Sequence, residues 1–314
     1  MTGFVARPYA GAADLALLID FARANMIARL PGGTYWKPGD ITWQFYRLHG
    51  AACDDVRLWD DDRGLAGVVA FEPPLTMAFD VRSDVALDSK LLDDMLSWAA
   101  ERRAAVAQAN EDEPRAYAQL GAGVSTLVAA SDEERVAALE MRGYRRIGEG
   151  GVRYELSLTK PIPDDVLPAG MRLRYATDED VAARAAAHRA AWSVWGTSRF
   201  SDEAYRELRA APLYDEQLDV ILEDASGRIV SYCICWADEA TGAGHFEPVG
   251  TDAAFARRGF GKLVMHEGLR RLRARGMHTA LVGTAWVNEP ARALYPASGF
   301  ELRDVEWWWE SRGG

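Results

Sequence analysis

The clearest helical pattern in the chain lies between residues 260 and 276. Apolar side chains recur there at helical spacing, and arginines occupy the opposite face toward the C-terminal end. The apolar positions are Val264, Met265, Leu269 and Leu272, and the arginines are Arg270, Arg271, Arg273 and Arg275. Gly276 follows as a residue type that ends helices. The pattern predicts an amphipathic helix with one face in a core.

A buried strand and a second helix are predicted after that helix. Residues 278 to 284 form an apolar run of strand length. Asn288 belongs to the residue types that cap helices, Pro290 suits a first helical turn, and Gly299 suits the end of the helix. These landmarks predict an α/β fold.

The same order of elements occurs twice along the chain. Each copy begins with a strand ending in arginine and a helix entered through aspartate, turns a hairpin at glycine, and closes on glycine plus an aromatic residue. The matching positions are Arg7 and Arg174, Asp14 and Asp180, Gly64 and Gly227, and Gly143-Tyr144 and Gly299-Phe300. This spacing is typical of a duplicated domain and too long for a solenoid repeat. We expect domains at residues 1–160 and 170–314, joined by a proline-rich linker at 161–169.

The composition is that of a globular protein with an acidic surface. The 314 residues are enough for two cores, and a net charge of −11 argues against nucleic-acid binding. The chain shows no secretory signal and no run of roughly 20 apolar residues, so no membrane partner is expected. Three cysteines fit a reducing compartment, which predicts a cytoplasmic protein. Cys233 and Cys235 lie in an alternating strand pattern, which favours small buried side chains over a metal or redox site.

The turn before the predicted helix indicates anion binding. In the run Arg257-Arg258-Gly259-Phe260-Gly261-Lys262, two glycines and two arginines stand where the helix begins. A tight turn leaves backbone N–H groups unpaired there, and the helix dipole adds positive potential, which suits a pyrophosphate. The spacing excludes a dinucleotide fingerprint, which needs glycine at Val264. It also excludes a P-loop, which needs glycine at Ala256 and serine or threonine at Leu263.

Two segments together resemble the acyl-CoA N-acyltransferases of the GNAT superfamily. The turn resembles their pattern Gln/Arg-x-x-Gly-x-Gly/Ala, although Ala256 replaces its first residue. The segment from Asn288 to Phe300 resembles their second pattern, Asn-x-x-Ala-x-x-Leu-Tyr-x-x-x-Gly-Phe, at every fixed position. The resemblance implies two tandem α/β (α+β) domains, each a mixed twisted sheet flanked by helices. The two-domain plan resembles the mycothiol-synthase type of tandem member.

The resemblance also implies an acetyl-CoA site in the C-terminal half. The pyrophosphate is expected on the backbone of Arg257, Arg258, Gly259, Phe260, Gly261 and Lys262. The pantetheine arm is expected along Val249, Gly250 and Thr251, beside a bulge that Pro248 favours. Asn288 is expected to cap its helix and to line the cofactor groove, and no metal is expected.

Tyr295 and Glu247 are the expected catalytic residues. A phenol, with a reference pKa of about 10, can give a proton to a departing thiolate. Tyr295 lies two helical turns after Asn288, on the same helix face; the alternative is a half-buried core aromatic. Glu247 stands where the superfamily often places a carboxylate that deprotonates the amine directly or through water. The alternative for Glu247 is a solvated or salt-bridged strand residue.

Aromatic and histidine side chains are weaker candidates. The acceptor-pocket candidates are Tyr35, Trp36, Trp192 and Trp195. Core packing is the alternative for these residues, since most tryptophans lie in cores. His245 shares the strand face of Glu247 and is a second candidate for the base. His266 and His278 fit exposed positions.

The N-terminal half lacks the residues of a second CoA site. No glycine occurs between Gly67 and Gly121, so the phosphate turn has no counterpart there. Leu139 stands where the C-terminal half has Tyr295. We expect this half to be a degenerate copy that keeps the fold and helps to shape the acceptor cleft.

Together these features predict an N-acyltransferase that moves an acetyl group from acetyl-CoA to a primary amine of a small molecule. Mycothiol-synthase-like acetylation of a thiol precursor stays open, and so does a non-catalytic CoA-binding or sensing module. Both a monomer and a homodimer are compatible with the sequence.

Overall fold

The computed structural model describes residues 3–29, 35–47, 55–72, 76–87, 89–109, 123–196 and 198–311. The strands are β1 (Val5–Pro8), β2 (Val56–Asp61), β3 (Gly64–Glu72), β4 (Thr76–Val81), β5 (Ser125–Ala129), β6 (Tyr144–Ser157), β7 (Arg172–Tyr175), β8 (Asp219–Glu223), β9 (Ile229–Asp238), β10 (Ala243–Thr251), β11 (Thr279–Ala285) and β12 (Glu301–Ser311). The helices are α1 (Ala12–Arg29), α2 (Pro38–Tyr46), α3 (Lys90–Ala109), α4 (Glu133–Glu140), α5 (Val181–Trp192), α6 (Asp202–Arg209), α7 (Phe260–Ala274) and α8 (Glu289–Ala297). Short 3-10 turns include η3 (Ser193–Trp195) and η5 (Ala253–Phe255).

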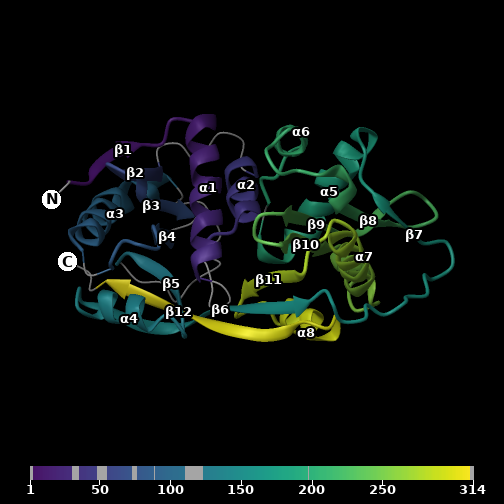
Figure 1. Ribbon diagram of the computed structural model, residues 1–314. Helices are drawn as coiled ribbons and strands as arrows, with labels where there is room; N and C mark the ends of the chain where they lie inside the picture. The colour runs from purple at the N-terminus through teal and green to yellow at the C-terminus, as the bar shows by residue number, and fades with distance from the viewer. Residues whose placement is uncertain are drawn as a thin grey trace.

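The strands form one mixed sheet that runs through both halves (Figure 1). Its order is β1-β2-β3-β4-β5-β12-β6-β11-β10-β9-β8-β7. Each half contributes an antiparallel series and then one parallel pair, β4 with β5 and β10 with β11. The predicted mixed α/β fold is confirmed, and the repeated order of elements appears as two similar halves of one sheet.

The last strands of the two halves exchange places at the centre of the sheet. β12, at the end of the chain, pairs with β5 of the N-terminal half and with β6. β6 in turn pairs with β11 of the C-terminal half. Each core therefore includes the other half's last strand: Tyr154 of β6 packs in the C-terminal core, and Trp309 of β12 packs in the N-terminal core. The domain boundaries at 1–160 and 170–314 therefore stay a prediction. They describe two repeats in the sequence, whereas each core in the structure contains a strand from the other half.

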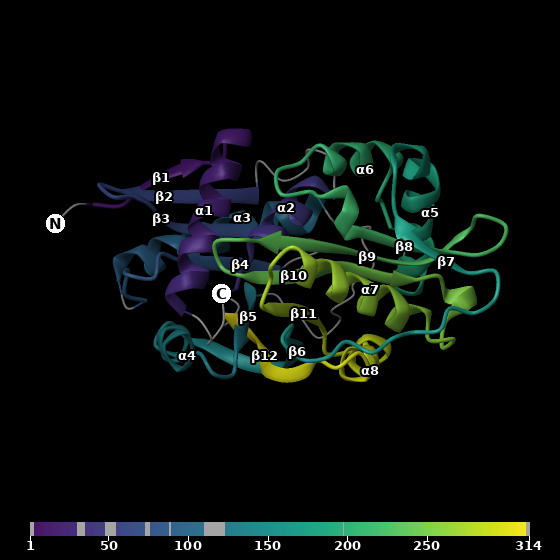
Figure 2. The same ribbon diagram turned by 45° about the vertical axis from the view of Figure 1, so that its right-hand side comes forward.

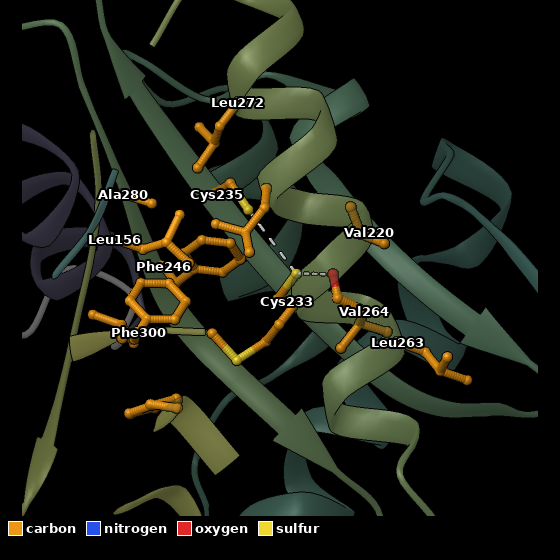
Figure 3. Packing of buried hydrophobic residues seen from close by; sticks show 14 of the residues in the cluster. Leu156, Val220, Cys233, Cys235, Phe246, Leu263, Val264, Leu272, Ala280 and Phe300 are labelled. Atoms are coloured by element: carbon orange, nitrogen blue, oxygen red, sulfur yellow. Dashed lines mark hydrogen bonds between the residues drawn. The ribbon is translucent and has the colours of Figure 1, made fainter. Parts of the chain in front are cut away.

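Helices cover both faces of the C-terminal half of the sheet (Figure 2). Side chains of β9 alternate between these faces. Cys233 and Cys235 point toward α7 and pack in the same core cluster as Val264 (Figure 3). Ile234 and Trp236 point the other way, into a cluster with α2, α5 and α6. The prediction that both thiols face one side, as buried core groups, is confirmed.

The helix boundaries follow the predicted signals closely. α7 begins at Phe260, and the left-handed Gly276 (φ 81°) follows it. α8 has Asn288 as its N-cap, and the Asn288 side chain accepts a hydrogen bond from the Ala291 amide at 3.3 Å. The apolar run after α7 is β11. These ends were predictable because caps and left-handed glycines act locally.

Candidate functional site

The parallel strands β10 and β11 separate halfway along their length. They pair only from Ala243 with Thr279 to Phe246 with Val282. On its other side, β10 pairs with β9, and that register shifts between Phe246 and Val249. Within the described residues, the edge of β10 beyond Phe246 that faces β11 therefore has no partner strand. The expected bulge beside Val249 is present, and its open backbone groups can bind an extended ligand.

Gly250 is required where the separated part of β10 crosses Tyr232 of β9. A Cβ atom on Gly250 would lie 2.4 Å from the Tyr232 hydroxyl oxygen. On the same stretch, the Ser231 hydroxyl donates to the Gly250 carbonyl at 3.0 Å and contacts the Thr251 hydroxyl at 2.8 Å. These contacts fix the strand beyond the bulge from the β9 side.

The turn that follows β10 presents a row of open backbone donors. Arg257 and Gly259 have positive φ angles of 60° and 82°. In the described part of the chain, the amides of residues 257–261 donate to no acceptor, whereas the Lys262 amide donates to the Gly259 carbonyl at 3.1 Å. Arg257 and Arg258 are exposed beside these amides. Left-handed residues at a helix N-terminus form a concave site for an anion, so the turn can bind a pyrophosphate through five of the six predicted residues.

Tyr295 of α8 lies in the C-terminal core. It is 5% exposed and packs edge-on to Tyr154, with ring centroids 5.6 Å apart. Its hydroxyl makes no hydrogen bond to another described residue. Burial, and then the negative charge of Glu247, raises the pKa of Tyr295 above its ordinary value. The phenol is therefore protonated at neutral pH and available as a donor.

The negative charge of Glu247 acts on the Tyr295 hydroxyl. Glu247 is half-buried at the bulge, and its charge acts on the hydroxyls of both Tyr295 and Tyr232. Asn288 begins the helix that carries Tyr295, so its side-chain oxygen is engaged as the cap. A carboxylate at the bulge thus acts electrostatically on a neutral phenol in the C-terminal core.

Tyr232 and His188 belong to the same region, although no motif marks them. The Tyr232 hydroxyl lies 2.8 Å from His188 Nδ1, and Trp192 lies beside it. Trp192 also stacks on His188 at 5.5 Å. Burial and nearby arginines hold the pKa of His188 well below its ordinary value, so the imidazole is neutral. The alternation of β9 places the Tyr232 side chain on the sheet face opposite Cys233 and Cys235. Alternation alone does not mark a residue as functional, so the sequence did not indicate Tyr232 as a site residue.

The four predicted pocket aromatics lie in two different places. Trp192 lies beside Tyr232. Trp195 lies three residues later, on η3, and its side chain is 37% exposed. Tyr35 instead donates to Asp132 at 2.9 Å within the N-terminal half. Trp36 is buried in the N-terminal core. The structure therefore does not bring Tyr35 and Trp36 together with Trp192.

The three histidines named from the sequence have separate surroundings. His245 is buried against Asp40 of α2, with Nε2 3.1 Å from the carboxylate. His266 is also buried, and its Nδ1 lies 2.9 Å from Asp165 in the linker. The prediction of an exposed His266 is therefore wrong, because the linker packs over α7. His278 is exposed, as predicted.

The N-terminal half has a cleft at the position equivalent to the gap between β10 and β11. β4 and β5 pair only at Thr76 with Ser125 and at Met77 with Thr126, and a cavity of about 540 Å³ adjoins their diverging ends. Arg135 lines this cleft and stacks between Tyr35, at 3.9 Å, and Phe79, at 4.4 Å. It is 1% exposed and donates to Asp80 and Asp132. An ion-pair network around the buried Arg135 thus lines this cleft.

The described residues contain no group of three or more metal-ligand side chains placed to hold a metal ion. None of the helices described is both long and apolar enough to cross a membrane.

Comparisons with known proteins agree with this geometry. Residues 185–300 match the acetyltransferase (GNAT) family. A mycothiol acetyltransferase from Saccharomonospora viridis is 30% identical over 186 residues, which are 56% of this chain and 60% of that protein. The chain thus aligns with about 60% of the length of that relative.

Solved structures show the same overall fold. A tandem GNAT protein from the clavulanic acid biosynthesis pathway has a TM-score of 0.64 at 16% identity, covering 100% of this chain and 99% of that one. A GCN5-related N-acetyltransferase from Sphaerobacter thermophilus has a TM-score of 0.60 at 18% identity, covering 98% and 94%. The predicted resemblance to tandem members of the superfamily is confirmed.

Proposed function

Because residues 185–300 match the acetyltransferase (GNAT) family, we propose that this chain transfers an acetyl group from acetyl-CoA to a primary amine of a small molecule. Members of the family use acetyl-CoA as donor. The observation that best supports the proposal is the separation of β10 from β11, with Glu247 at the bulge, its charge acting on Tyr295, and open amides at residues 257–261.

The proposed cofactor contacts use backbone groups. The amides of residues 257–261 and the flanking arginines would bind the pyrophosphate, and the open edge of Val249 to Thr251 would pair with the pantetheine arm. These contacts would align the thioester with the bulge. Alignment of two reactants is itself a large part of such a rate enhancement.

The proposed reaction needs one proton acceptor and one donor. The neutral amine nitrogen attacks the thioester carbonyl carbon, forming the C–N bond, and the C–S bond then breaks. Glu247 takes the proton that the nitrogen loses, directly or through water. Tyr295 donates to the thiolate as it departs, because its raised pKa keeps the phenol protonated.

Thiol release from acetyl-CoA, measured over a panel of primary amines, tests the proposal. We expect release that depends on the acceptor, with an acetylated product detected by mass spectrometry. Stabilisation of the protein by CoA without release for any amine would favour the CoA-binding or sensing module instead. The amine precursor of mycothiol belongs in the panel, because the relative from Saccharomonospora viridis is a mycothiol acetyltransferase.

We expect one molecule of acetyl-CoA to bind per chain. The N-terminal cleft contains the buried Arg135 network, and its sequence has no counterpart of the glycine turn at residues 257–261. Isothermal titration calorimetry would measure the stoichiometry. A value near two would contradict a degenerate N-terminal half, and Arg135→Ala would then show whether the second molecule occupies this cleft.

A further inference from the structure

A helix of the N-terminal half lies against the strand that carries Glu247. α2 packs on β9 and β10, on the sheet face opposite α7 (Figure 1). Trp43 of α2 lies 5.5 Å from His188 and 5.3 Å from Phe200, between ring centroids. The degenerate half thus borders the proposed site directly, and two residues of α2 have contacts that lead to Glu247.

The first contact runs from Gly39 through Trp236. A Cβ atom on Gly39 would lie 2.4 Å from both Cβ and Cγ of Trp236, so the helix backbone rests directly on this side chain. Trp236 is 2% exposed, and its indole Nε1 donates to the Glu247 carbonyl at 2.6 Å. The indole is therefore held between α2 and the backbone of Glu247.

That indole hydrogen bond compensates for a local loss of strand pairing. Glu247 lies beyond the last pair of β10 with β11 and inside the register shift of β10 against β9. A buried carbonyl that lacks a ladder partner is unfavourable unless another donor satisfies it. Trp236 supplies that donor, so the orientation of the Glu247 peptide depends on where the indole lies.

The second contact joins Asp40 to His245, two residues before Glu247. The carboxylate lies 3.1 Å from His245 Nε2, and Lys37 contacts the same carboxylate group at 2.8 Å. Burial lowers the pKa of His245 to about 3. Although burial alone acts in the opposite sense, the charge and hydrogen bonds of Lys37 act to lower the pKa of Asp40. The imidazole Nε2 thus contacts the Asp40 carboxylate, and this contact joins α2 to β10 just before the bulge.

We propose that α2 of the N-terminal half positions the Glu247 carboxylate, through Gly39 against Trp236 and through Asp40 against His245. This inference rests on the proposed function. These four residues are positioning residues, since none of them contacts the reacting atoms in the proposed reaction. The degenerate half then has a defined task, which is to hold the bulge in its working geometry.

Three variants test this assignment. Trp236→Phe removes the indole donor while keeping an aromatic ring, Asp40→Asn removes the charge while keeping the shape, and Gly39→Ala displaces the indole. We expect each to lower kcat with the amine about 10-fold and to shift the pH profile of kcat. KM for acetyl-CoA should stay within about twofold, because the turn at 257–261 is not touched.

A matched glycine provides the control. Gly148→Ala adds the same methyl group at a position with nothing within 4 Å and no positive φ. We expect wild-type kinetics and an unchanged thermal midpoint. Wild-type kcat and pH profile in both Trp236→Phe and Asp40→Asn would overturn the assignment.

Hydrogen–deuterium exchange separates this inference from the proposed function. We expect the peptide covering residues 243–251 to exchange about 10-fold faster in Trp236→Phe and Gly39→Ala than in wild type. Unchanged exchange in both would overturn the positioning role. Absence of thiol release in the wild type would instead overturn the proposed function, while the exchange result would still decide whether α2 holds β10.

Discussion

Tyr295→Phe is expected to lower kcat about 100-fold with acetyl-CoA and a saturating amine, within the range typical of a lost general acid. The variant keeps the ring that packs on Tyr154 and removes only the hydroxyl. Because burial and Glu247 raise the pKa of Tyr295, the wild-type donor should remain protonated throughout the physiological range. The measurement is steady-state thiol release from pH 6 to pH 10.

Tyr154→Phe is the matched control for that experiment. Tyr154 is a buried tyrosine in edge-on contact with Tyr295, so the change removes a hydroxyl from the same cluster. We expect kcat within about threefold of wild type and a similar thermal midpoint for both variants. If the two variants lose activity equally, or neither does, Tyr295 acts by packing and is not the proton donor.

Reversing the charges beside the turn should weaken cofactor binding. The double variant Arg257→Glu and Arg258→Glu is expected to raise Kd for acetyl-CoA about 100-fold. The arginines flank the open amides of residues 257–261, and contacts to charged groups contribute roughly 1.5–3 kcal/mol each. Affinity in the wild type should also fall with added salt, since both side chains are exposed. Isothermal titration calorimetry at two salt concentrations measures both effects.

Arg273→Glu supplies the comparison for charge reversal on the same helix. Arg273 is exposed near the C-terminal end of α7, far along the helix from the turn. We expect Kd for acetyl-CoA within about twofold of wild type, because exposed charges beyond a Debye length are largely screened. An equal loss of affinity in both variants would mean that overall charge, and not the turn, governs binding.

Much of the site was predictable because its parts are local in sequence. A turn with two glycines before an amphipathic helix exposes amides wherever it folds, and Asn288 caps its helix through the Ala291 amide three residues later. Tyr295 follows Asn288 on the same helix face, so its placement required only helical geometry. The buried His266 was not predictable, since its partner Asp165 comes from the linker.

The contacts made across the chain required the tertiary structure. Nothing in the periodicity of β6 or β12 indicates that each strand lies in the other half of the sheet, because both neighbours offer equivalent backbone hydrogen bonds. The sequence likewise gives no indication that Gly39 packs on Trp236 or that Tyr232 packs against Gly250. By itself, the sequence determined the elements, the anion-binding turn and the helix that carries Tyr295, since these depend on hydrogen bonds between residues close in the chain. Only the tertiary structure decided how Glu247 is held, because its supports come from β9 and from a helix about 200 residues earlier.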